Sequence, residues 1–161
     1  MAETDTQPAM ADPFPATRPR VRPPWRVLGM VSAGGVLGAV ARYGLGLAFP
    51  HRPAGFPWAT FAVNVSGCLL IGVLMVLVTD VWPARPLLRA FLGTGLLGGY
   101  TTFSTYVVDT QHLLAAGAAR AALAYLAGTL LAALVAVQTG AMLTRLVIHR
   151  LSHPRRRNRE T

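Results

Sequence analysis

Four long apolar stretches constrain this chain more than any other feature of its sequence. They run from Val27 to Phe49, from Trp58 to Thr79, from Leu87 to Val108 and from Ala121 to Thr144. Each has roughly the 20 residues that an α-helix needs to cross the hydrocarbon core of a bilayer. Because hydrocarbon cannot satisfy backbone polar groups, each stretch must form a helix. The pattern predicts an all-α membrane protein with four transmembrane helices, in which short loops make neighbouring helices antiparallel.

The composition agrees with a membrane environment. Of the 161 residues, 53% are apolar and only 13% are charged, whereas about 25% are charged in a typical soluble domain. The ends differ from the rest of the chain, because residues 1–25 and 151–161 are polar and rich in arginine. We expect two disordered basic tails around one four-helix transmembrane domain at residues 26–150.

The basic residues lie mostly on one side of the predicted membrane. With four spans, both termini share a side with the loop after the second span, and that side carries all but three of the fifteen basic residues. The exceptions are Arg42, Arg52 and Arg120. The positive-inside rule therefore places both termini in the cytoplasm. A basic tail could also bind nucleic acid or anionic lipid, but the flank of a spanning helix has this composition by default.

The third stretch contains a segment that disfavours a continuous helix. Gly98-Gly99-Tyr100-Thr101-Thr102-Phe103-Ser104-Thr105-Tyr106 combines paired glycines with three β-branched threonines. A break within the membrane frees backbone groups, and freed carbonyls suit a hard cation such as Na⁺. Gly95 and Gly99, and likewise Gly34 and Gly38, have the spacing that lets two helices pack closely. Close packing does not explain the threonines, so we predict a broken third helix.

Several polar or aromatic side chains within the spans are candidates for a functional site. Asn64 and Arg42 lie inside apolar helices, where a polar side chain needs a partner or a water-filled cavity. Phe103 and Tyr106 share a face after the break, beside Ser104, and aromatic ring edges are electropositive. With one buried cation and no negatively charged acceptor, the pattern favours an anion pathway.

The fourth stretch could extend this row of hydrogen-bond donors. Tyr125 and Thr129 lie one turn apart, although a tyrosine at the membrane interface and a threonine bonded to its own helix are equally good interpretations. Asp80 and Asp109 are predicted to lie at helix ends, which leaves no carboxylate in the middle of the membrane. Cys68 is the only cysteine, and no pairing of nucleophile and base indicates an enzyme.

Three motifs in order resemble the Fluc (CrcB) fluoride channel family. They are GGVLGAVARY from Gly34, TFAVN from Thr60 and GGYTTFSTY from Gly98. The resemblance covers all four predicted helices. It implies a channel that passively exports fluoride across the bacterial plasma membrane and so lowers fluoride toxicity. It also implies an antiparallel dimer of dual topology, with two pores and a central Na⁺.

The resemblance also assigns roles to individual residues. It places the Na⁺ on the backbone carbonyls of Gly98 and Thr101, and it lines the fluoride pore with the side chains of Phe103, Tyr106, Asn64, Ser104, Arg42, Tyr125 and Thr129. Tyr106 departs from the family pattern, in which phenylalanine is commoner, and Val107 stands where serine is frequent.

Two alternatives concern the assembly and the function. The arginine bias fits poorly with identical subunits that insert both ways, so we hypothesise a fixed orientation and an oppositely oriented homologous partner. A small multidrug exporter also has four helices and opposed dimers. Its proton coupling needs a carboxylate in the first helix, and none occurs between Val27 and Phe49.

Overall fold

The computed structural model describes residues 25–50 and 55–152. The predicted tails fall almost entirely outside these residues, as does Arg52. Helices make up most of the described chain, and it contains no strand. In order, the elements are α1 (Trp25–Ala48), α2 (Trp58–Val76), the π-helical η1 (Leu77–Val81), α3 (Pro86–Arg89), the π-helical η2 (Ala90–Leu97), α4 (Gly98–Tyr100), α5 (Phe103–Ala115) and α6 (Ala119–Ser152).

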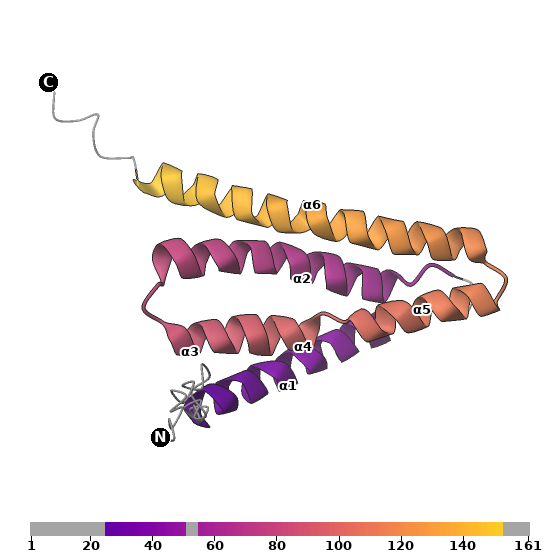
Figure 1. Cartoon of the computed structure of the whole chain (residues 1–161), viewed down its shortest axis with the longest axis horizontal. Coiled ribbons are helices and arrows are strands. Elements are labelled where there is room, and N and C mark those ends of the chain that lie inside the picture. Colours follow the sequence, from indigo (N-terminus) through magenta and orange to yellow (C-terminus); the bar gives the residue numbers. More distant parts are fainter. Residues whose placement is uncertain (1–24, 51–54, 153–161) are drawn as a thin grey trace, which may run out of the picture.

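The helices form an array in which α2 is central (Figure 1). α2 packs along α6 on one side, and the row from α3 to α5 runs along its other side. α1 packs across η2 and α4, away from α6. Within residues 25–50 and 55–152, three helices are long and apolar enough to cross a membrane: 25–48, 58–81 and 119–151. The all-helical membrane fold predicted from the sequence is therefore confirmed at this level.

The predicted break in the third stretch is present. The helical turns that begin at Pro86 end at Tyr100, and α5 begins at Phe103. Between them Thr101 has ψ of 156° and Thr102 has φ of −147°, both in the extended region. Neither half is long enough to span a bilayer alone, which is why the described part of the chain has three continuous spans and not four.

Glycines allow the helix backbones to approach closely, as the sequence spacing predicts. A Cβ atom on Gly38 of α1 would overlap the carbonyl oxygen of Leu96, and one on Gly95 would lie 3.0 Å from the Cα atom of Gly34. α2 and α6 meet in the same way, since a Cβ atom on Gly72 would overlap the carbonyl oxygen of Val137. Both contacts fix the helices that surround the break.

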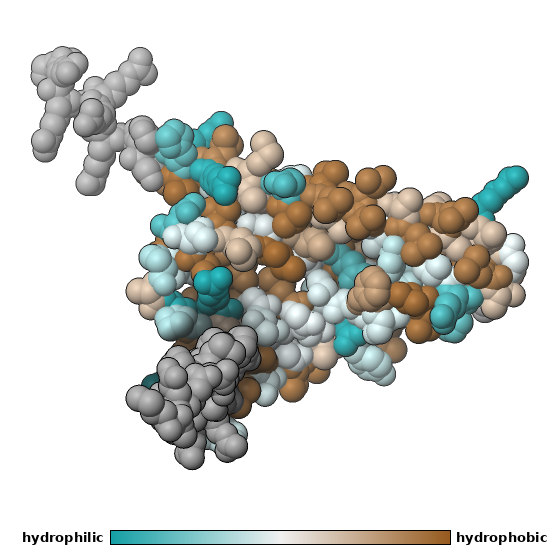
Figure 2. Space-filling model, viewed as in Figure 1, coloured by the Kyte–Doolittle hydropathy of each residue, from teal (hydrophilic) through white to brown (hydrophobic). Residues whose placement is uncertain are grey.

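The most deeply buried cluster lies where α5, α6 and the start of α2 meet. Leu113, Ala122 and Tyr125 are almost fully buried there and pack against Phe56 and Phe61. Much of the outer surface is apolar by contrast, and Figure 2 shows apolar side chains spread over α6. Large side chains such as Leu131 are well exposed on that helix. Such a surface suits contact with lipid or with another apolar protein surface.

Candidate functional site

Asn64 of α2 holds the broken backbone at Thr102. Its Nδ2 atom donates to the carbonyl oxygen of Thr102, and the amide of Thr102 donates to Asn64 Oδ1, each at 2.9 Å. In a continuous helix that amide would bind the carbonyl of Gly98 instead. The side-chain amide therefore replaces the backbone hydrogen bond that the break removes. Because Nδ2 carries two hydrogens, one remains for another acceptor.

The threonines around the break each have a local role. Thr101 ends the first half, since both its amide and its hydroxyl donate to the carbonyl of Leu97, at 3.0 and 2.9 Å. Thr102 caps the start of α5, because its hydroxyl oxygen accepts from the amide of Thr105 at 3.1 Å. Caps of this kind satisfy the unpaired amides of a helix N-terminus. The break is thus encoded locally and completed by α2.

A second contact between α2 and the break was not predicted from the sequence. The hydroxyl oxygens of Ser66 and Tyr100 lie 2.9 Å apart. A Cβ atom on the neighbouring Gly67 would overlap the methyl group of Thr101. α2 therefore contacts the chain on both sides of the break. The only sequence signal is that Ser66 and Gly67 follow Asn64 by two and three residues.

One cavity beside the break brings together four of the predicted pore residues: Asn64, Phe103, Tyr106 and Thr129. Its volume is about 270 Å³, and its other lining residues are Cys68, Ile71, Thr101, Thr102, Leu130 and Ala133. Thr129 is 5% exposed, and its hydroxyl oxygen is buried without a hydrogen-bond partner. The rings of Phe103 and Tyr106 lie 5.9 Å apart. The lining of the cavity thus includes polar side chains and aromatic rings.

A second cavity contains Arg42. It has a volume of about 360 Å³ and lies between α1, the start of α2 and the residues after the break. Arg42 is half-buried, and its Nε atom is buried without a hydrogen-bond partner. Thr102 lines both cavities. The break therefore separates a cavity that holds a cation from one that holds neutral donors.

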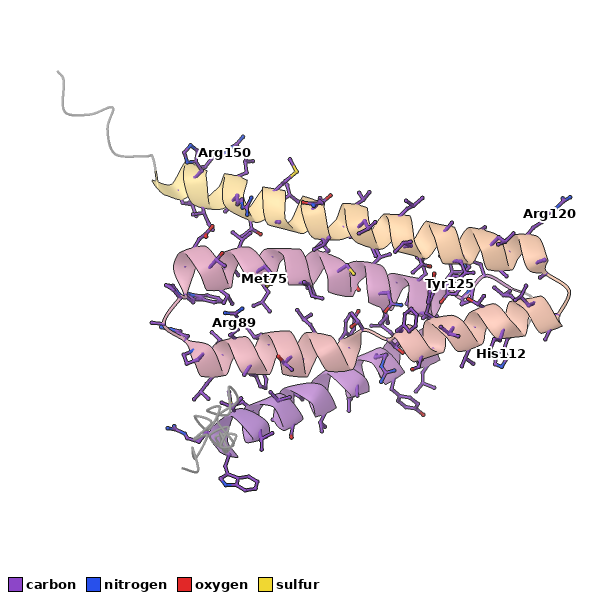
Figure 3. All side chains as sticks on the ribbon, in the orientation of Figure 1. Met75, Arg89, His112, Arg120, Tyr125 and Arg150 are labelled. Carbon is purple, nitrogen blue, oxygen red and sulfur yellow. The ribbon has the colours of Figure 1, made fainter. Side chains whose placement is uncertain are left out.

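Two predicted pore residues lie elsewhere. Tyr125 is fully buried and lines neither cavity; it points from α6 toward the junction of α2 and α5 (Figure 3). Its hydroxyl donates to Asp109 Oδ2 at 3.3 Å. Ser104 is exposed, also lines neither cavity, and lies 3.3 Å from the hydroxyl oxygen of Thr102. Tyr125 and Thr129 are therefore neighbours on α6 with different surroundings.

The prediction that Asp109 lies at a helix end was wrong. α5 continues to Ala115, and Asp109 is a buried residue inside it, 6% exposed. Thr60 of α2 donates its hydroxyl to Asp109 Oδ2 at 2.6 Å, in addition to the bond from Tyr125. The sequence indicated a loop here because the polar residues Gln111 and His112 follow Asp109 closely. Both are exposed residues on the outer face of α5.

The fold and the cavities define a class of protein: a helical membrane protein with a broken helix beside two cavities, each lined in part by polar side chains. Residues 29–141 match the family model described as CrcB-like protein, Camphor Resistance (CrcB). The chain belongs to this family.

Curated relatives cover most of the chain. It is 53% identical over 132 residues to fluoride-specific ion channel FluC 2 of Streptomyces avermitilis, which covers 80% of this chain and 82% of the relative. It is 54% identical over 126 residues to FluC 2 of Nocardia farcinica, covering 78% and 89%. With FluC of Rhodospirillum centenum the identity is 45% over 119 residues, covering 73% and 94%. The resemblance seen in the sequence motifs is thereby confirmed.

Proposed function

We propose that this chain is a fluoride-specific channel that exports fluoride passively across the plasma membrane and lowers its toxicity in the cytoplasm. Relatives of high identity are named fluoride-specific ion channels. The observation that carries the proposal is the cavity beside the break, which is lined by Asn64, Thr129, Phe103 and Tyr106. The hydroxyl of Thr129 is buried there without a hydrogen-bond partner.

The chemistry of this cavity suits a small dehydrated anion. Fluoride must exchange its water for other donors, and the second hydrogen of Asn64 Nδ2 and the hydroxyl of Thr129 are two of them. The edges of the Phe103 and Tyr106 rings add positive potential without a formal charge. Neutral donors bind an anion weakly enough for it to leave again, which conduction requires.

Arg42 supports the same function from the second cavity. Its guanidinium lies in a cavity of about 360 Å³ that shares Thr102 with the first. A positive charge in a confined cavity raises the local concentration of anions. We assign Arg42 to a vestibule that attracts fluoride ahead of the neutral pore.

The break is the proposed site of a structural Na⁺. The amide of Thr102 binds Asn64, so the carbonyl of Gly98 lacks the donor that a continuous helix would give it. Carbonyl oxygens of Gly98 and Thr101 are suitable ligands for a hard cation. Two carbonyls are too few to complete its coordination, and an antiparallel second subunit would supply two more at the dimer interface.

The proposed dimer explains why one large apolar side chain beside the cavity is exposed in the single chain. Phe103 is 77% exposed although it borders a cavity inside the membrane-spanning region. We propose that a second subunit covers it, and that the two subunits have opposite orientations in the lipid bilayer. The arginine bias favours a homologous subunit of opposite orientation as the partner, with both termini of this chain in the cytoplasm.

Cysteine accessibility tests the orientation. Arg120 and Arg150 lie near opposite ends of α6 (Figure 3), so we would place single cysteines there in a Cys68→Ala background. A fixed orientation predicts labelling of Arg120→Cys only from outside the cell and of Arg150→Cys only from the cytoplasm. Labelling of both positions from both sides would show that this chain inserts in two orientations and needs no second homologue.

Fluoride efflux from liposomes that contain this purified chain alone tests the function. Chloride is the competing anion, and Asn64→Asp is the inactive control. Fluoride-selective efflux that the mutant lacks would support a self-sufficient homodimer. If the chain alone is inactive, co-reconstitution with its homologue should restore efflux, and failure of both would contradict the proposal. A multidrug exporter, the alternative considered, would need a carboxylate that α1 does not contain.

A further inference from the structure

Tyr106 differs from the other aromatic residue of the cavity because its hydroxyl is bound to a different helix. The hydroxyl donates to the backbone carbonyl of Leu126 in α6 at 2.8 Å. The ring itself belongs to α5 and borders the same cavity as Asn64 and Thr129. The side chain of Tyr106 therefore connects α5 to α6 at the wall of the cavity.

This hydrogen bond determines what Tyr106 can offer to an anion. A phenol carries one proton, and that proton is directed to Leu126. The oxygen then presents only lone pairs, which repel an anion. The ring edge, with its partial positive charge, remains the part of Tyr106 that can face the cavity favourably.

The same bond restricts the ring. Its Cα atom is held by α5 and its oxygen by α6, and the rings of Phe103 and Tyr125 flank it at centroid distances of 5.9 and 5.2 Å. A phenylalanine at this position would keep the ring contacts but lose the bond to α6. The direction of the ring axis, and the local separation of α5 and α6, would then be less restricted.

We infer that Tyr106 is a positioning residue for selectivity, whose hydroxyl ties α5 to α6 and holds the cavity wall at a width suited to a small anion. This inference rests on the proposed fluoride channel. Chloride is larger than fluoride, so a wall that can widen gives it more access. The hydroxyl is not a fluoride ligand in this arrangement.

The test compares three variants of this chain with the wild type, each reconstituted in the proposed dimer. Tyr106→Phe removes the bond, 4-aminophenylalanine at position 106 restores a donor, and Thr139→Val is the matched control. Thr139 also donates to a carbonyl of α6, that of Val135 at 2.7 Å, but it is exposed and lines neither cavity. The two readouts are the ratio of fluoride to chloride efflux and the thermal unfolding midpoint.

We expect Tyr106→Phe to lower the ratio of fluoride to chloride efflux about fivefold, because chloride efflux becomes faster. A fivefold change corresponds to one neutral hydrogen bond of roughly 1 kcal/mol. Fluoride efflux should persist, and 4-aminophenylalanine should restore the ratio and the unfolding midpoint. Slower fluoride efflux with unchanged chloride efflux would overturn the inference and make the hydroxyl a ligand. An unchanged ratio would overturn it too. If the wild type conducts no fluoride, the proposed function fails, while the unfolding midpoints still decide whether the bond to α6 exists.

Discussion

Asn64 on α2 binds both backbone polar groups of Thr102, which lies 38 residues further along the chain, through two hydrogen bonds of 2.9 Å. A side-chain amide carries a donor and an acceptor on separate atoms, so it can pair with both the amide and the carbonyl that a missing turn of helix leaves free. Both backbone polar groups of Thr102 are therefore paired, although the chain is extended there in an apolar environment. The same side chain borders the cavity proposed for fluoride.

Asn64→Asp should destabilise the break as well as stop fluoride. A carboxylate can accept from the amide of Thr102 but cannot donate to its carbonyl, so one buried acceptor is left unpaired beside a negative charge. We expect the free energy of unfolding in detergent to fall by about 1–3 kcal/mol and fluoride efflux to be lost. Gln111→Glu is the matched control, because Gln111 is an exposed amide on α5. Equal stability of the two variants would contradict the role of Asn64 at the break.

Thr129→Val should lower fluoride conduction without lowering stability. The hydroxyl is buried without a partner, so its replacement by a methyl group should leave the unfolding midpoint unchanged or raise it. Fluoride efflux should fall by about tenfold, the equivalent of one hydrogen bond to a charged group. Thr129→Ser keeps the hydroxyl and should conduct like the wild type. Fluoride efflux at the wild-type rate in Thr129→Val would show that the Thr129 hydroxyl is not part of the fluoride pathway.

Asp109→Leu should destabilise the junction of α5 with the starts of α2 and α6. The hydroxyls of Thr60 and Tyr125 both donate to Asp109 Oδ2, and both would lose their acceptor in a buried environment. We expect the loss to reach about 2–4 kcal/mol, since each unpaired group costs roughly 1–3 kcal/mol. Asp80→Leu is the comparison, because Asp80 is exposed.

A double-mutant cycle with Thr60→Val isolates the bond between Thr60 and Asp109. The double variant should lose less than the sum of the two single losses, because neither partner is then left unpaired. Simple additivity, measured by chemical denaturation, would show that the 2.6 Å bond contributes nothing specific.

Gly38→Ala should separate α1 from the broken helix. The new Cβ atom would overlap the carbonyl oxygen of Leu96, which is backbone and cannot move aside. Gly44→Ala on the same helix is the matched control, since no atom lies within 4 Å of its Cβ position. We expect Gly38→Ala to unfold at lower temperature and Gly44→Ala to unfold at equal or higher temperature, because alanine favours helix by about 1 kcal/mol. Similar midpoints would indicate that α1 is loosely packed.

The sequence by itself determined the features that depend on neighbouring residues. The apolar stretches specify helices because hydrocarbon leaves the backbone no other way to pair, and the Gly98–Tyr106 segment specifies a break because its residues disfavour helix. The spacing of Gly34 and Gly38, and of Gly95 and Gly99, likewise indicated close helix packing, but not which helices meet. Helix ends were less certain, since the polar residues after Asp109 look like a loop whether or not α5 continues through them.

Only the tertiary structure decided which side chains meet. Asn64 and Thr102 are 38 residues apart, Thr60 and Asp109 are 49 apart, and Tyr106 and Leu126 are 20 apart. Tyr125 and Thr129 looked alike in the sequence, yet the hydroxyl of Tyr125 binds Asp109, whereas that of Thr129 is buried without a partner. The physical reason is that a side chain's partner depends on helix rotation and crossing. Those are set by contacts among all the helices at once, not by any one of them.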